Sequence, residues 1–217
     1  MLKIAANFGS RAVHRAFPPA PLDGTEGAMS RLYLIRHAKP LSSWGGDDPD
    51  PGLDATGSAQ ALAARDALMR LPASERPVRV VSSPLRRCRE TAAPTAEALG
   101  VEVEIDPAVG EIPTPRALAD AERPAWLARA MAGTWAAIEG DIDYQAWRGA
   151  VAAALVGRGA TAVFSHFVAI NAVVSALRGE ARVVSFRPDH ASITVLETDG
   201  DGLTLIGKGA EASTGVL

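Results

Sequence analysis

Two of the four histidines in this 217-residue chain stand directly after short apolar runs, a position where catalytic groups are often found. His37 follows Arg36 at the end of one run, and His166 ends another. Arg87 lies about one turn into a helix that we expect after a third run. Neutral imidazole is a good nucleophile, and a guanidinium group makes paired hydrogen bonds to phosphate oxygens. These residue types therefore indicate a cationic pocket for a phosphoryl group.

The elements that position these residues alternate between strands and helices along the chain. This order predicts an α/β fold: a three-layer αβα sandwich with a mostly parallel central sheet and helices on both faces. Ligands of such sheets bind beyond the carboxyl ends of the strands. We expect strands at 31–36, 78–82, 101–105 and 161–165, helices at 55–70, 83–99, 124–138, 143–156 and 166–177, and a closing hairpin at 192–198 and 203–207. Ser83 is the expected N-cap of the second helix, with Pro84 at its first position.

The length fits one domain, which we place at residues 29–217. Residues 1–28 lack the apolar core of a secretory signal, and we interpret them as a flexible extension before Met29. Within the domain, residues 107–157 begin with an irregular, proline-containing stretch and continue into two helices. We expect this segment to form a helical lid over the site.

Composition excludes several other classes of protein. The net charge of −3 argues against a nucleic-acid-binding protein, which needs a basic surface. Cys88 is the single cysteine, so an internal disulfide and a cysteine-cluster metal site are excluded, and we expect it in the core. The uncharged stretch 159–177 contains Ser165, His166 and Asn171, so we interpret it as a buried strand and helix rather than a membrane span. We expect a cytoplasmic protein with no membrane partner.

Five segments, in order along the chain, resemble the histidine phosphatase superfamily, in its phosphoglycerate-mutase-like branch. The resemblance spans most of residues 31–207. The segments are LIRHAKP (34–40), LDATGSAQA (53–61), SSPLRRCRETA (82–92), VGEIP (109–113) and FSHFVAINAV (164–173).

The resemblance assigns roles to individual residues. His37 would be the nucleophile that becomes a transient phosphohistidine, and Arg36 and Arg87 would bind the phosphoryl group. His166 would be the second catalytic histidine, which donates to the phosphoryl oxygens as their negative charge grows. Glu111 would protonate the leaving oxygen and then activate water.

The chain departs from the family pattern near the nucleophile. Ala38 stands where the family usually has glycine, and a negative φ at this position would allow the alanine. Ser43 stands where many members have asparagine, and its hydroxyl could still bind phosphate. Trp44, Arg86 and His190 are candidates for the rim of the substrate pocket. The tryptophan and glycine that usually follow the acid are absent after Glu111. The assignment of Glu111 therefore depends on fewer matching residues than the assignments of the other site residues.

The implied activity is that of a histidine-type acid phosphatase, a phosphoric monoester hydrolase that releases inorganic phosphate from a small phosphorylated metabolite. The resemblance implies no metal and no other cofactor, because arginines and histidines would neutralise the charge that Mg²⁺ handles elsewhere. A phosphoglycerate-type mutase, a protein phosphohistidine phosphatase and a non-catalytic phosphate-binding module remain alternatives. The sequence is also compatible with a homodimer.

Overall fold

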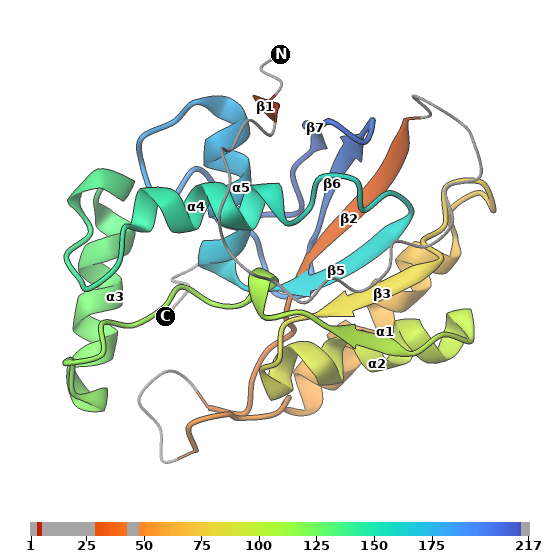
Figure 1. The fold of residues 1–217 in the computed structure, drawn as a ribbon. Coiled ribbons are helices and arrows are strands. Elements are labelled where there is room, and N and C mark those ends of the chain that lie inside the picture. Colours follow the sequence, from red (N-terminus) through yellow and green to blue (C-terminus); the bar gives the residue numbers. More distant parts are fainter. Residues whose placement is uncertain (1–3, 6–28, 43–47, 214–217) are drawn as a thin grey trace.

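The computed structural model describes residues 4–5, 29–42 and 48–213, and its centre is one twisted seven-stranded sheet (Figure 1). The strand order is β1-β7-β6-β2-β5-β3-β4. Helices lie on both faces of this sheet, so the predicted three-layer α/β architecture is confirmed.

One half of the sheet is parallel and carries the strand ends that the sequence marked. It consists of β2 (Ser30–Arg36), β5 (Thr161–Ser165), β3 (Arg79–Ser82) and β4 (Val103–Ile105). Arg36 pairs with Ser165, and Ser82 pairs with Phe164, so the carboxyl ends of the three inner strands meet at one edge. The residues that follow these strands must therefore lie close together.

The other half of the sheet is antiparallel. β6 (Ile193–Thr198) pairs with β2, and β7 (Gly202–Gly207) pairs with β6, which confirms the predicted closing hairpin. β1 (Ile4–Ala5) pairs with β7 and so adds part of the N-terminal extension to the sheet edge. The rest of the flexible extension that we expected at 1–28, namely residues 1–3 and 6–28, lies outside the described residues.

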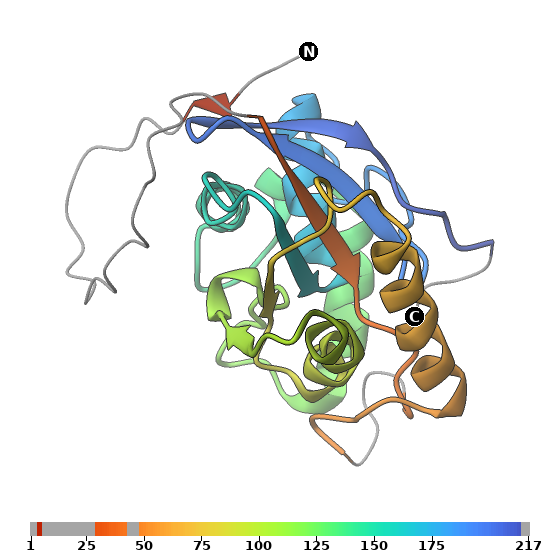
Figure 2. The same cartoon turned by 90° about the vertical axis from the view of Figure 1, so that its right-hand side faces the viewer.

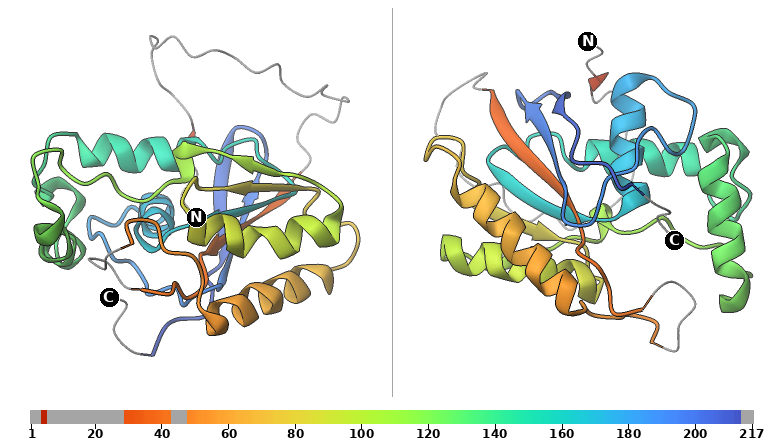
Figure 3. Two further views of the ribbon diagram at one scale, coloured as in Figure 1. Left: turned by 90° about the horizontal axis from the view of Figure 1, so that it is seen from below. Right: turned by 180° about the vertical axis from the view of Figure 1, so that it is seen from behind.

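Alternating side chains of the central strands build two separate cores. Leu32 and Leu34 of β2 pack in one core with α5 (Phe167–Arg178) and α4 (Tyr144–Ala153). The neighbouring Tyr33 and Ile35 point to the opposite face, where they pack in the core of α2 (Arg86–Leu99). Figures 2 and 3 show α2 side by side with α1 (Ala55–Met69) on that face.

The second helix begins later than the sequence predicts. Ser83 and Pro84 remain outside the helix, and Leu85 is the N-cap residue, with extended backbone angles. Our prediction of Ser83 as the N-cap is therefore wrong; an Asp50 carboxylate oxygen instead accepts a hydrogen bond from the Arg86 backbone N–H at 2.8 Å. The start of α1 and the end of α2 agree with the predicted helices at 55–70 and 83–99. Asp54 caps α1, and Gly100, with a φ of 68°, ends α2.

The segment 107–157 is more broken than predicted. The expected helix at 124–138 is a shorter helix, α3 (Arg123–Ala132), followed by a 3₁₀ turn at Trp135–Ala137, because Gly133 has extended backbone angles and ends the helix. Short 3₁₀ turns also occur at Pro107–Val109 and Asp120–Glu122. In Figure 1, α3 stands on the side toward which the parallel strands point.

The apolar stretch 159–177 is divided between buried β5 and α5, of which it includes all but the last residue, as predicted. Within the described residues, no helix has both the length and the apolar character needed to cross a bilayer.

Candidate active site

Backbone hydrogen bonds hold together the three loops that leave the inner parallel strands. The His37 N–H donates to the Ser165 carbonyl at 2.9 Å, and the Ser83 N–H donates to the Phe164 carbonyl at 3.0 Å. His166 then occupies the N-cap position of α5. The histidines are therefore placed by the rigid sheet edge and not by independent loops.

A backbone contact fixes the tautomer and the ring orientation of His37. Its Nδ1 lies 2.9 Å from the Ala38 carbonyl oxygen, which can only accept, so Nδ1 carries the hydrogen and Nε2 carries the lone pair. Burial, followed by the charges of His166, Arg87 and Arg36, lowers the pKa of His37 well below its usual value. Neutral imidazole with an unprotonated Nε2 is the nucleophilic form.

The alanine after the nucleophile fits without strain. Among the described residues other than glycine, a positive φ occurs only at Ala160 and Ala191, so Ala38 has the negative φ that we expected. Its N–H donates to the Thr91 hydroxyl of α2 at 2.9 Å, which ties the loop after His37 to that helix.

Arg36 and Arg87 place two buried guanidinium groups beside the histidines. One nitrogen of Arg36 donates to the Pro188 carbonyl at 2.9 Å, and a nitrogen of Arg87 lies 3.3 Å from Nδ1 of His166. The Nε atoms of both arginines are buried without a hydrogen-bond partner in the described structure. Burial lowers the pKa of Arg36 to about 10. Buried cations with unused donors are suited to binding an anion.

Glu111 lies next to the second histidine. Its Oε2 is 3.5 Å from Nδ1 of His166, and its Oε1 accepts a hydrogen bond from the Ile112 N–H at 3.0 Å. Burial raises the pKa of Glu111, although the charge of Arg87 opposes this shift. A carboxyl group with a raised pKa can hold a proton at higher pH and give it to a reacting oxygen.

His37 lies close to both other histidines of the domain. The ring centroid of His37 lies 5.3 Å from that of His166 and 5.8 Å from that of His190. Burial and then Arg36 lower the pKa of His190 to about 4, so all three rings are neutral near pH 7. His190 thus lies beside His37, the proposed nucleophile. The sequence indicates His190 as a candidate for the rim of the pocket.

The remaining rim candidates are placed differently. Arg86 pairs with Glu90 at 2.7 Å on an exposed part of α2, outside the buried cluster. Ser43 and Trp44 lie outside the described residues, so their predicted roles in binding phosphate and lining the rim stay predictions. Cys88 is buried in the core, as predicted, and its thiol lies 3.4 Å from Nε2 of His166.

Sequence reasoning missed one cation near the site. Arg123, at the start of α3, is half-buried, and its charge acts on both Glu111 and His166. No motif surrounds Arg123 in the sequence, so nothing there distinguishes it from an ordinary surface arginine. Its position depends on the path of the chain between Glu111 and α3, which the sequence pattern does not predict.

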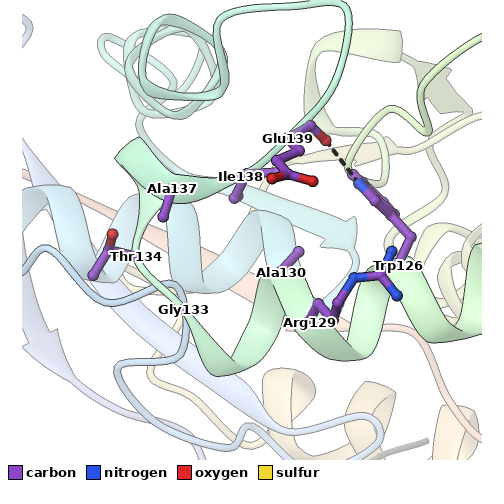
Figure 4. Close-up of a pocket in the computed structure, with 8 residues that line it drawn as sticks. All are labelled: Trp126, Arg129, Ala130, Gly133, Thr134, Ala137, Ile138 and Glu139. Carbon is purple, nitrogen blue, oxygen red and sulfur yellow. Dashed lines mark hydrogen bonds between the residues drawn. The ribbon is translucent and has the colours of Figure 1, made fainter.

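A separate cavity of about 170 Å³ lies between α3 and the 3₁₀ turn that follows it (Figure 4). At the edge of this cavity, the Trp126 indole N–H donates a hydrogen bond to the Glu139 carbonyl at 2.8 Å. No residue of the histidine and arginine cluster lines this cavity. Among the described residues, no group of three or more His, Cys, Asp or Glu side chains has an arrangement that could hold a metal ion.

Comparison with known families agrees with this geometry. The model of the histidine phosphatase superfamily (branch 1) matches residues 32–209, so the chain belongs to that superfamily. A curated relative, the uncharacterized protein Rv0525 of Mycobacterium tuberculosis, is 41% identical over 81 residues. That match covers 36% of this chain and 38% of the relative, so it spans well under half of either protein.

Solved structures share the fold over most of the chain. The mycobacterial glucosyl-3-phosphoglycerate phosphatase Rv2419c is 25% identical with a TM-score of 0.63, and the match covers 85% of this chain and 100% of that structure. The phosphoserine phosphatase of Entamoeba histolytica is 19% identical with a TM-score of 0.64, over 83% of this chain and 96% of that structure, which supports the fold alone. The chain therefore belongs to the histidine phosphatase superfamily and has the phosphoglycerate-mutase-like architecture.

Proposed function

We propose that this protein hydrolyses a small phosphomonoester through a transient phosphohistidine on His37. The observation that carries the proposal is the hydrogen bond from Nδ1 of His37 to the Ala38 carbonyl, which leaves the Nε2 lone pair for attack. Arg36 and Arg87 supply unused donors beside this ring. The phosphatases among the solved relatives support the reaction class.

In the first step, Nε2 of His37 attacks phosphorus and the bond from phosphorus to the ester oxygen breaks. Glu111 gives its proton to the departing oxygen, so an alcohol leaves. Arg36, Arg87 and His166 stabilise the negative charge on the remaining phosphoryl oxygens. Arg87 lies 3.3 Å from Nδ1 of His166, the His166 and His37 rings lie 5.3 Å apart, and Arg36 precedes His37 in the chain, which supports the proposal that one phosphoryl group contacts all three.

In the second step, water gives a proton to the Glu111 carboxylate while its oxygen bonds to phosphorus. The bond between phosphorus and Nε2 breaks, inorganic phosphate leaves, and both His37 and Glu111 return to their starting forms. Every charge in this cycle is met by a side chain of the protein, so we propose that the reaction needs no metal ion.

The decisive experiment measures hydrolysis of p-nitrophenyl phosphate in the presence of EDTA. We expect turnover by the wild type, and a loss of several orders of magnitude in kcat for His37→Ala, because the nucleophile is removed. Acid quenching of the wild type during turnover of a ³²P-labelled substrate should trap an acid-labile phosphohistidine.

The matched control is His14→Ala, in the N-terminal extension, where we expect unchanged turnover. Equal rates for His37→Ala and wild type would reject the proposal, as would full turnover without any acid-labile phosphoenzyme. Transfer of the phosphoryl group to a second substrate without release of free phosphate would indicate a mutase. Binding of phosphate with no turnover of any ester would indicate a non-catalytic module.

A further inference from the structure

The two ring nitrogens of His166 face different surroundings. Nδ1 lies 3.3 Å from a guanidinium nitrogen of Arg87 and 3.5 Å from Oε2 of Glu111, so this edge faces the catalytic cluster. Nε2 lies 2.7 Å from the Ser83 hydroxyl and 3.4 Å from the Cys88 thiol, so this edge faces the packed interior at the start of α2. The ring has no exposed surface and cannot exchange these edges without repacking.

The position of the single hydrogen on the neutral ring decides what His166 can do. A donor to phosphoryl oxygens needs the hydrogen on Nδ1, the nitrogen that faces the cluster. Arg87 opposes this arrangement, because its N–H groups are best met by an Nδ1 lone pair. A second interaction must therefore favour the Nδ1–H tautomer.

The Ser83 hydroxyl can supply this interaction. Its oxygen accepts a hydrogen bond from the Leu85 N–H at 3.4 Å, which leaves its hydrogen for Nε2 of His166. The residue has no exposed surface, and its own N–H bonds to the Phe164 carbonyl, so the hydroxyl is fixed in place. The other neighbour of Nε2, the thiol of Cys88, has an acceptor of its own in the Ser165 carbonyl at 3.4 Å.

We propose that Ser83 is a positioning residue that donates its hydroxyl hydrogen to Nε2 of His166 and so fixes the Nδ1–H tautomer. His166 then presents a donor to the phosphoryl group in both steps of the reaction. This inference rests on the proposed function for the role of His166, and the tautomer follows from that role together with the contact between Nε2 and the Ser83 hydroxyl. It also explains why Ser83 does not cap α2: its side chain is used by the histidine.

The kinetic test compares three variants with p-nitrophenyl phosphate. For Ser83→Ala we expect kcat to fall about 10- to 100-fold with little change in KM, which is the usual effect of losing a partner that orients a histidine. Ser83→Thr keeps the hydroxyl and should recover most of the loss. Ser82→Ala is the matched control, since Ser82 is equally buried but its hydroxyl donates to the Ser83 carbonyl at 2.9 Å.

The spectroscopic test measures the ¹⁵N shifts of His166 in protein labelled at histidine, with its signals assigned by their loss in His166→Asn. We expect the Nδ1–H tautomer in the wild type and a shift toward Nε2–H in Ser83→Ala. A wild-type ring with its hydrogen on Nε2 overturns the proposal, even if no Ser83 variant folds. A wild-type kcat in Ser83→Ala, or equal losses in Ser83→Ala and Ser82→Ala, also overturns it.

The two proposals fail in different ways. If the wild type hydrolyses no phosphomonoester, the proposed function is wrong, and the tautomer of His166 still tests the contact with Ser83. If turnover and the phosphohistidine are present but the tautomer is Nε2–H, only the role of Ser83 is wrong.

Discussion

At the scale of single residues, the site combines groups whose pKa values are shifted in opposite directions. Burial lowers the pKa of His37 and raises the pKa of Glu111. The shifts favour a neutral nucleophile and extend the pH range in which the acid keeps its proton, and these are the two forms that the first chemical step requires. The same low-polarity surroundings thus prepare both groups.

Glu111→Gln should separate substrates by their leaving groups. Glutamine cannot donate a proton to an alkoxide, so we expect kcat for an alkyl phosphate to fall about 10²- to 10⁴-fold. The loss with p-nitrophenyl phosphate should be smaller for the first step, because nitrophenolate leaves without protonation. Steady-state rates with both substrates, and burst measurements of phosphoenzyme formation, check this expectation.

The pH profile gives the matching control. The first step needs protonated Glu111, so the wild-type rate with an alkyl phosphate should fall as the pH rises through the raised pKa of that group. In Glu111→Gln this alkaline limb should disappear. Full turnover of an alkyl phosphate by the variant would show that another group is the acid.

At the scale of elements, the sequence predicted the site where secondary structure alone determines position. Arg36 ends β2, and His37 and His166 directly follow β2 and β5, so the apolar runs located all three residues. Arg123 and the contact of Ser83 with His166 depend on loop paths and on side-chain direction, which have no periodic pattern. The error at the start of α2 has the same origin, because its capping group comes from Asp50, far away in the chain.

The turn that carries His190 is held in an unfavourable backbone conformation. Ala191 has a φ of 57°, in the left-handed region that favours glycine, and its N–H donates to the Arg36 carbonyl at 3.1 Å. We expect Ala191→Gly to raise the free energy of unfolding by up to about 1 kcal/mol, because it relieves this strain. Urea unfolding measures the change.

A helical alanine provides a control of opposite sign. Ala150 is exposed in the middle of α4, and Ala150→Gly should lower the free energy of unfolding by roughly 0.5–1 kcal/mol. If both substitutions destabilise the protein equally, the turn at Ala191 stores no relievable strain. Activity of Ala191→Gly would then show how firmly His190 must be held beside His37.

At the scale of the whole molecule, the site is an assembly of distant parts of the chain. Arg36 and Arg87 meet only when β2, β3 and β5 lie side by side. Their guanidinium groups are buried in one cluster, and the charge of each opposes that of the other. An anion that binds between them should therefore stabilise the folded state over the unfolded state.

Inorganic phosphate should raise the melting temperature of the wild type. At a concentration 100 times its Kd, phosphate would add about 2.7 kcal/mol to the free energy of unfolding. Arg87→Met should lose most of this response, whereas Arg129→Met, which changes an exposed arginine at the separate cavity, should keep it. Thermal unfolding at increasing phosphate concentration, with chloride at equal ionic strength, tests this prediction.

The sheet order also has a consequence for synthesis on the ribosome. β2 lies between β5 and β6, whose residues 161–165 and 193–198 are translated more than a hundred residues later. The apolar strand that precedes the nucleophile therefore has no neighbour until residue 165 has been made, and it gains the second neighbour only at residue 198 of 217. Slow pairing of distant strands leaves apolar segments exposed to aggregation, so newly made chains of this protein should be natural clients of ribosome-associated chaperones.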